Sequence, residues 1–361
     1  MIVLKRYIVL FLFFFLPVNV FSLCENSCSC ILIDSGSGRV LYEKNSRDKM
    51  LIASTTKLMT FLVAYENMDL DMEIEAGEEV LKMYGTSIYI SMGEKMTLRD
   101  LLYGLILRSG NDSSMVIASY FGYDKFVSLM NKKAKELGMN DTIFYNPHGL
   151  DEETKNYSTS YDMALLGNYL NTIPFYLEVS GTKHYMTSTS LKAYDWYNRN
   201  KLLSLYKYSI TGKNGYTPSA GKTLVSGAMK SDFILTAVSL DDYDIYNTHI
   251  NLYEYGFDKY KLYFILNKDN FTYKDKSYNG TFYINNSFFY PLSDDEKDDV
   301  NIVVQIIRGV DTDITDKVGN IIVYLNEEEI YRDDLFININ LSKKKVNIFS
   351  KLYLFFKDLV S

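Results

Sequence analysis

The sequence predicts a mixed α+β domain, then a small all-β domain and, at the end of the chain, an amphipathic helix. Its 361 residues are too many for one ordinary domain. Hydrophobic residues make up 47% of the chain and aromatic residues 15%, which can fill substantial cores and favours β-rich parts over disorder. Helical and strand patterns are mixed before about Lys259, whereas short runs of Tyr, Phe, Ile and Val, broken by turn residues, follow it.

The first 22 residues have the pattern of a cleaved export signal. Lys5 and Arg6 precede a short apolar run, and small residues stand at the offsets expected for cleavage after Ser22. A transmembrane helix needs roughly 20 apolar residues, and this run is shorter. We therefore expect residues 1–22 to be a signal peptide and the protein to be exported.

Three cysteines follow the expected cleavage point: Cys24, Cys28 and Cys30. Because the number is odd, one thiol stays free or pairs between chains. The sequence leaves open a Cys28–Cys30 disulfide, a Cys24–Cys30 disulfide or free thiols. A lipidated Cys24 and a metal site are disfavoured, because the preceding residues make a poor lipobox and no histidine is near.

Within the first domain, residues 23–258, the pattern predicts a hairpin, helices and returning strands. A turn at Asp34–Gly38 lies between two alternating apolar runs. An apolar helix from Ser54 to about Tyr65 should be buried, because its pattern is apolar nearly all round. The other expected elements are helices at Thr97–Leu107 and Tyr123–Leu137, a helix capped by Ser113 or Ser114, and strands at Thr223–Lys230 and Phe233–Leu240.

The all-β domain is expected over residues 259–338. Its predicted strands lie near Phe264 and at Phe271–Tyr273, Thr281–Ile284, Val300–Ile307 and Gly319–Leu325. The acidic run Asp294–Asp299 is expected to be a solvated loop.

Charge is segregated between an acidic body and a basic tail. The net charge is −7, yet residues 342–361 carry five lysines and one aspartate. The acidic body makes nucleic acid an improbable partner. Residues 339–361 place apolar side chains at helical spacing opposite polar ones, which favours an interfacial membrane anchor over a helix packed on the protein.

Three short motifs together carry the parts of an acyl-transfer site. They supply a hydroxyl nucleophile, a lysine that activates it, a relay hydroxyl with an amide, and a cation for a carboxylate. In chain order they are Ser54-Thr55-Thr56-Lys57, Ser109-Gly110-Asn111 and Lys213-Asn214-Gly215. Since Lys57 lies one turn after Ser54 on a buried helix, desolvation should lower its pKa and let it act as a base.

Each motif alone is weak. The chain contains six Ser-x-x-Lys matches, and Ser54 could be a helix cap with Lys57 at the surface. Ser109 and Asn111 are ordinary capping residues, and Lys213 could be a solvated charge. Because Lys213-Asn214-Gly215 precedes the strands expected at Thr223–Lys230 and Phe233–Leu240, we expect it on an edge-accessible strand, where Gly215 would let a substrate backbone approach closely. Because the three motifs occur together and in this order, we interpret them as one acyl-transfer site.

The motifs are similar to those of the D-alanyl-D-alanine carboxypeptidases, the low-molecular-mass penicillin-binding proteins of the S11 peptidase type. The resemblance covers roughly residues 28–258. It extends to the segments Ala53–Thr60, Gly93–Thr97, Ser109–Asp112, Phe126–Asn131, Leu137–Met139, Asn146–Asp151 and Tyr216–Gly221. It implies a serine β-lactamase/transpeptidase-like domain, followed by a β-rich domain and an amphipathic anchor.

The resemblance also implies the roles of the site residues. Ser54 would be the acyl-ester nucleophile and Lys57 its general base. Ser109 would relay the proton, and Asn111 would position the substrate. The substrate-binding set would be Lys213, which binds the terminal carboxylate, with Asn214, Gly215 and Tyr216; the N–H groups of Ser54 and Tyr216 would form the oxyanion hole.

Two departures from the family pattern concern the carboxylate pocket. The third motif normally carries Thr or Ser where this chain has Asn214. Family members often have an arginine in the stretch that is here Ile245–His249, which contains none; His249 is a weak substitute. His148 fits the family's Asn-Pro-His-Gly-Leu loop and has no catalytic place there.

We therefore expect an exported serine-type D-Ala-D-Ala carboxypeptidase that acts on peptidoglycan stem pentapeptides and is acylated by β-lactam antibiotics. It would work at the outer face of the cytoplasmic membrane or in the cell wall. No cofactor or metal is implied, because the three histidines offer no ligand spacing.

The alternative is a degenerate penicillin- or peptidoglycan-binding relative with little turnover. A β-lactamase or an endopeptidase is a second rival; no carboxylate is evident that would drive rapid deacylation of a penicilloyl-enzyme.

Overall fold

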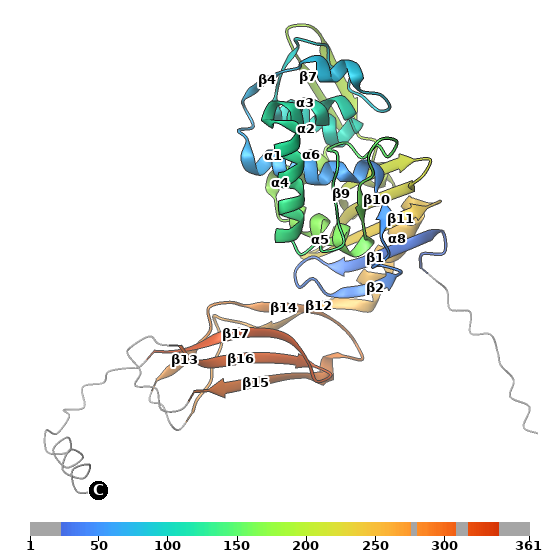
Figure 1. Ribbon diagram of the computed structural model, residues 1–361. Helices are drawn as coiled ribbons and strands as arrows, with labels where there is room; N and C mark the ends of the chain where they lie inside the picture. The colour runs from blue at the N-terminus through green and yellow to red at the C-terminus, as the bar shows by residue number, and fades with distance from the viewer. Residues whose placement is uncertain (1–22, 276–279, 308–316, 339–361) are drawn as a thin grey trace, which may run out of the picture. The chain divides into compact units, whose positions relative to one another are not determined.

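The computed structural model describes residues 23–275, 280–307 and 317–338 (Figure 1). Contacts divide the chain into two units. The first takes in the chain to Ile31, Tyr42–Ser226 and Ala237–Leu252; the second takes in Leu32–Leu41, Gly227–Thr236 and the chain from Tyr253. The signal peptide and anchor helix expected at 1–22 and 339–361 lie outside the described residues. The domain boundaries drawn from the sequence stay predictions.

The principal sheet has five strands in the order β2-β1-β11-β10-β9. Their bounds are β1 Ser27–Asp34, β2 Val40–Lys44, β9 Ser209–Thr217, β10 Gly221–Lys230 and β11 Phe233–Asp242. The expected hairpin and returning strands are therefore present. Because β9 ends the sheet order, Lys213 stands on an edge strand, as the sequence predicted.

The four predicted helices of the first domain are present with shifted ends as α1 to α4, and the described residues form four further helices, α5 to α8, that the sequence patterns did not predict (Figure 1). They are α1 Lys57–Asn67, α2 Leu98–Tyr103, α3 Asn111–Phe121, α4 Tyr123–Glu136, α5 Ser160–Leu170, α6 Pro174–Gly181, α7 Leu202–Leu205 and α8 Ile245–Lys259. Residues 57–64 of α1 are all buried, as its apolar pattern predicted. Ser54 itself lies in a 3-10 turn, η1 Ala53–Thr56, that leads into α1.

The expected cap of α3 is wrong. Gly110 occupies the N-cap position, and Ser113 and Ser114 lie inside the first turn. Their hydroxyls donate instead to the carbonyl oxygens of Leu101 and Asn111, at 2.5 and 2.7 Å. The sequence offered two serine candidates, and the structure excludes both as caps because each hydroxyl is buried against a carbonyl oxygen.

Short strand pairs complete the first unit. They are β3 Met50–Leu51 with β6 Tyr157–Ser158, β4 Glu73–Glu75 with β5 Lys95–Thr97, and β7 His184–Ser188 with β8 Ala193–Tyr197. Two single turns also belong to this unit: η2 Glu78–Lys82 lies between β4 and β5, and the π-helical η3 Gly104–Arg108 lies between α2 and α3. A disulfide joins Cys24 to Cys30, and Cys28 is an exposed free thiol.

The described part of the second unit beyond α8 is all β, as the sequence predicted. A pair, β12 Tyr260–Leu266 with β14 Phe288–Ser293, accompanies a sheet in the order β13-β17-β16-β15. Those strands are β13 Thr281–Tyr283, β15 Val300–Ile306, β16 Lys317–Leu325 and β17 Glu328–Asn338, with the turn η4 Lys297–Asp299 before β15. The strand expected at Phe271–Tyr273 is wrong; these residues are irregular. Both rings instead pack against the core.

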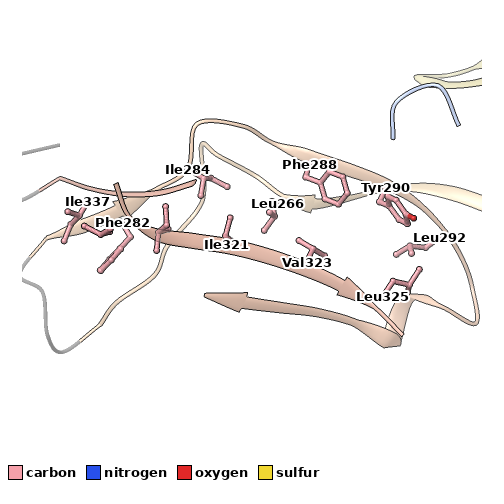
Figure 2. Close-up of a cluster of buried hydrophobic side chains, with 12 residues drawn as sticks. Leu266, Phe282, Ile284, Phe288, Tyr290, Leu292, Ile321, Val323, Leu325 and Ile337 are labelled. Atoms are coloured by element: carbon pink, nitrogen blue, oxygen red, sulfur yellow. The ribbon is translucent and has the colours of Figure 1, made fainter. Parts of the chain in front are cut away.

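The core of this β region lies between the two sets of strands. Figure 2 shows Ile321, Val323 and Leu325 of β16 directed toward side chains of the β12–β14 pair. Phe282 of β13 and Ile337 of β17 fill one end of the same core and are fully buried. Alternation along each strand places these apolar side chains on one face.

The acidic run Asp294–Asp299 is only partly a solvated loop. The Glu296 carboxylate pairs with the Arg39 guanidinium and accepts from the Ser293 N–H at 2.9 Å. Arg39 also donates to the carbonyl of Pro291 at 2.5 Å. A partly buried ion pair thus fixes the position of Asp294–Asp299, although the composition of this segment alone indicates solvent exposure.

None of the helices within 23–275, 280–307 and 317–338 is long and apolar enough to cross a bilayer.

Replacing Phe282 by alanine tests the core of the second unit. Phe282 is fully buried, so the change should lower the free energy of unfolding by about 3–5 kcal/mol. Phe289→Ala, at a ring that is 46% exposed, is the matched control and should cost about 1 kcal/mol or less. Urea denaturation of the whole protein measures both. Equal losses would contradict the described core.

Candidate active site

The candidate nucleophile, Ser54, is presented by a strained turn. Ala53 just before it has φ +46°, in the left-handed region that non-glycine residues seldom adopt. The neighbouring Gly149 makes room for this turn: a Cβ on it would stand 2.0 Å from the Ala53 carbonyl oxygen. The Thr55 N–H and hydroxyl both donate to Ile52 O, at 3.2 and 2.6 Å, which fixes the turn from the other side.

Lys57 is fully buried, and its Nζ is surrounded by three oxygens. It donates to Asn111 Oδ1 at 2.7 Å and to the His148 carbonyl oxygen at 2.5 Å. The third oxygen, 3.1 Å away, is the Ser54 hydroxyl. Burial, helped by the charge of Lys213, lowers the pKa of Lys57 well below that of an exposed lysine.

This arrangement suits a neutral amine. A neutral amine has two N–H donors and one lone pair, and the two carbonyl-type oxygens can only accept. They take both N–H groups and leave the lone pair for the Ser54 hydroxyl proton. Lys57 is therefore placed to act as a base toward Ser54.

Asn111, at the start of α3, is buried and held by the loop between η2 and β5. Its Nδ2 donates to the Tyr84 carbonyl at 2.7 Å, so its Oδ1 is the atom that faces Lys57. Its backbone N–H donates to Thr86 O at 2.8 Å. Asp112 anchors the same loop by accepting from the N–H groups of Ile88 and Ile90, at 3.1 and 3.0 Å.

Ser109 and Lys213 form the second half of the site. Ser109 follows η3 with φ +63°, a second left-handed residue at the site. Lys213 Nζ donates to Ser109 Oγ at 2.9 Å and to the Asn214 carbonyl at 2.7 Å. Burial, together with the positive charge of Arg199, lowers the pKa of Lys213 to about 7. A hydroxyl is thereby linked to a cation that can lose its charge near neutral pH.

The predicted residues meet around one pocket of about 220 Å³. Those that line it are Ser54, Ser109, Asn111, Asn214, Gly215 and Tyr216. Lys57 and Lys213 are buried and reach the pocket residues through the hydrogen bonds given above. Gly215 brings the edge of β9 against the Ser54 turn, because a Cβ there would lie 2.7 Å from the Ser54 nitrogen.

Sequence reasoning missed Arg199. This residue follows β8, lines the pocket beside Asn214, and its backbone N–H donates to Leu107 O at 3.0 Å. The family pattern instead predicts an arginine in the stretch that is here Ile245–His249. The signal that could have found it is the pair of asparagines around Arg199, which cap their own turn: the Asn200 and Leu202 N–H groups donate to the Asn198 and Asn200 side chains.

The two histidines considered from the sequence contribute no charge here. His148 supplies its backbone carbonyl to Lys57, a contribution that side-chain chemistry could not reveal. Burial, the largest cause, lowers the pKa of its ring to about 3. His249 is buried beside Ser226 and Ser239, and burial lowers its pKa to about 3. His249 is not among the residues that line the pocket. Arg199, rather than His249, therefore supplies a second cation at the pocket.

No group of three or more His, Cys, Asp and Glu side chains that could hold a metal ion occurs among the residues that the structure describes.

A serine hydroxyl beside a buried lysine, at the edge strand of an antiparallel sheet, supplies the groups that acyl transfer requires. Residues 23–244 match the model of the S11 peptidase family, D-alanyl-D-alanine carboxypeptidase. The chain belongs to this family, as its motifs predicted.

Named relatives agree with this assignment. The chain is 36% identical over 224 residues to the D-alanyl-D-alanine carboxypeptidase DacF of Bacillus subtilis, covering 60% of this chain and 57% of DacF. It is 33% identical over 225 residues to DacC of Escherichia coli, covering 58% of this chain and 55% of DacC. The match thus spans little more than half the length of these relatives.

The fold extends the likeness to the C-terminal region. The structure of penicillin binding protein 5 from Haemophilus influenzae superimposes with a TM-score of 0.73 at 21% identity, covering 87% of this chain and 97% of that one. At 21% identity this comparison supports a statement about the fold alone. It confirms the predicted class, a transpeptidase-like domain followed by an all-β part.

Gly215→Ala tests the close approach of β9 to Ser54. The new methyl would press on the Ser54 nitrogen and displace the strand edge. Acylation of Ser54 by a fluorescent penicillin should slow about 100-fold or more, the size of effect seen when an oxyanion donor is lost. Gly36→Ala is the control, because its methyl meets its nearest neighbour at an ordinary 3.5 Å. Unchanged labelling of Gly215→Ala would contradict the geometry.

Proposed function

We propose that the protein is a serine-type D-Ala-D-Ala carboxypeptidase that removes the terminal D-alanine from peptidoglycan stem pentapeptides. The observation that carries the proposal is the setting of Lys57, whose amine is desolvated and held 3.1 Å from the Ser54 hydroxyl. Family membership and the names of the relatives support the substrate class.

In the proposed acylation step, Ser54 Oγ attacks the carbonyl carbon of the penultimate D-alanine and gives its proton to Lys57. The N–H groups of Ser54 and Tyr216 receive the oxyanion. Ser109 then passes a proton to the leaving amine, and the bond to the terminal D-alanine breaks. Water hydrolyses the acyl-enzyme and restores the Ser54 hydroxyl.

The terminal carboxylate would bind to Lys213, Asn214 and Arg199. Lys213 and Arg199 supply positive charge, and the Asn214 amide takes the place of the usual hydroxyl. Arg199 offers a cation that the Ile245–His249 stretch lacks. This weighs against the alternative of a relative that binds peptidoglycan with little turnover.

β-Lactams should acylate Ser54, and the resulting acyl-enzyme should be hydrolysed slowly. None of the ten residues that line the pocket is acidic, so no carboxylate there is positioned to activate the deacylating water. This property favours a penicillin-binding protein over a β-lactamase.

We further propose that the protein is exported through the signal at residues 1–22 and is held at the outer face of the cytoplasmic membrane by residues 339–361. The support is their composition: a charged start with an apolar run, and a basic amphipathic segment.

Intact-mass measurement of the purified protein tests the proposed function. After incubation with penicillin, the wild type should gain one covalent adduct and Ser54→Ala none. With a peptide ending in D-Ala-D-Ala, the wild type should release D-alanine. An adduct without release would favour the binding relative, and no adduct would refute the catalytic proposal.

The charge of Lys213 predicts a pH dependence. Its pKa is lowered, so the ammonium is present below about pH 7 and is lost above it. The kcat/KM for the carboxylate-bearing peptide should therefore fall as pH rises through about 7 in the wild type.

A conservative variant distinguishes the contribution of Lys213 to this pH profile from that of other titratable groups. Arginine stays charged, so Lys213→Arg should move this fall to higher pH, whereas Lys95→Arg, at an exposed lysine, should leave the profile unchanged. A fall at the same pH in Lys213→Arg would show that another group causes it.

A further inference from the structure

The last strand of the sheet in the second unit has an open edge. The order of this sheet is β13-β17-β16-β15, so among the described residues β15 pairs with β16 on one side and ends the sheet on the other (Figure 1). Its seven residues, Val300–Ile306, pair with β16 without a register shift. β15 therefore presents a regular backbone edge to which a further strand can add.

This edge lacks the features that usually prevent exposed sheet edges from pairing. Natural edge strands are short, or they carry charged side chains, proline or a bulge. The opposite edge strand, β13, has only three residues, whereas β15 is longer and contains neither a charged residue nor a proline. Its exposed side chains are also apolar: Ile302 is 47% exposed and Val303 is 39% exposed. Such an edge is expected to pair with another strand.

The hydrogen bonds to β16 determine which backbone groups of β15 face outward. Ile307, the residue after β15, donates its N–H to Val318 O at 2.8 Å, so its backbone groups face β16. Alternate residues of an antiparallel strand face the same neighbour, so Asn301, Val303 and Gln305 also face β16. The N–H and C=O groups that point to the open edge therefore belong to the remaining residues, Val300, Ile302, Val304 and Ile306.

The backbone of β15 can pair with a second copy of itself in antiparallel orientation. A partner strand forms hydrogen bonds where its own outward-facing residues stand opposite those of β15. A second β15 whose pairing is centred on Val303 meets this requirement. Ile302 then stands opposite Val304, and Val300 stands opposite Ile306. All seven residues of the strand are paired in this register.

The side chains favour the same register. Asn301 and Gln305 stand opposite each other in it, so amide meets amide and apolar residues meet only apolar ones. Because β15 carries no charge, no like charges meet across the pair. Registers centred on Ile302 or Val304 also align outward-facing residues, but each leaves an end of the strand unpaired. Each also places an amide side chain opposite Val303.

We propose that β15 is a self-association surface, and that two copies of this chain pair there in antiparallel orientation about a two-fold axis at Val303. The two four-stranded sheets then form one continuous sheet. A two-fold contact of this kind closes on itself, so the assembly stops at a dimer. The inference does not depend on the proposed function, because β15 lies in the second unit and Ser54 in the first.

Sedimentation equilibrium of the whole protein tests the association. The wild type should form a dimer with a dissociation constant of about 10–100 μM, because one pair of strand edges is smaller than the roughly 1,200 Å² of a standard interface. Val303→Lys should weaken the dimer about tenfold, because like charges then meet at the axis and an apolar contact is lost. Phe264→Lys is the matched control, since Phe264 is similarly exposed but lies on β12.

A mixture of charge variants tests the contact at the two-fold axis. Val303→Glu alone should associate as weakly as Val303→Lys. An equimolar mixture of the two should associate more strongly than either variant alone, because opposite charges then meet at the axis. Urea denaturation that matches the wild type confirms that each variant folds.

Engineered cysteines test the register. The exposed thiol is first removed by Cys28→Ser. The Cα atoms of a non-hydrogen-bonded antiparallel pair lie about 4.5 Å apart, which is within the range of a disulfide. On oxidation, Val303→Cys should therefore crosslink to its own copy. Asn301→Cys and Gln305→Cys should crosslink only when the two variants are mixed.

The outcomes decide between β15 and other surfaces. A wild type that stays monomeric up to about 300 μM overturns the proposal and leaves the edge for an extended segment of a different protein. Association that Val303→Lys does not weaken, or a dimer that Val303→Cys does not crosslink, places the interface elsewhere and also overturns it. Crosslinking of Gln305→Cys by itself overturns the pairing about Val303.

Discussion

The site depends on the burial of one amine, Nζ of Lys57. A charged ammonium without full compensation is costly inside a protein, so burial favours the neutral form. The oxygens around it come from three separate segments: the Ser54 turn, the start of α3 and the loop at His148. The packing of these three segments around α1 therefore stabilises the fold. The same packing buries the Lys57 amine and so favours its neutral form, which can act as a base.

The backbone around the amine is strained and is supported by its neighbours. Ala53 and Ser109 are both left-handed, at the two hydroxyl-bearing turns of the site. The loop at Gly149 fits against the first of them, and the Asn146 side chain accepts from the Gly149 N–H at 2.7 Å. Thr60 of α1 also donates to the Pro147 carbonyl at 2.6 Å, so the helix that carries Lys57 is joined to the loop that receives it. Such support is what keeps sparsely populated conformations in place.

Sequence patterns predicted those elements and site residues that a local periodicity or a short motif identifies. The hairpin, the all-round apolar α1 and the edge position of Lys213 could be read from spacing, and the site residues from their joint occurrence. Arg199 and the His148 carbonyl could not, because their roles arise from tertiary placement and, for His148, from a backbone atom. The predicted cap of α3 is wrong, and the pairing of Glu296 with Arg39 was not predicted, for the same reason: composition gives polarity, but the fold determines the partner.

The central claim is that Lys57 is neutral where other lysines are charged. NMR of the protein with ¹³C-labelled lysine Cε, with Lys57→Arg to assign the signal, measures its titration from about pH 6 to pH 11. The account predicts that Lys57 loses its proton at a pH well below that at which the exposed lysines lose theirs. Titration of Lys57 together with the exposed lysines, near pH ~10.4, would contradict it.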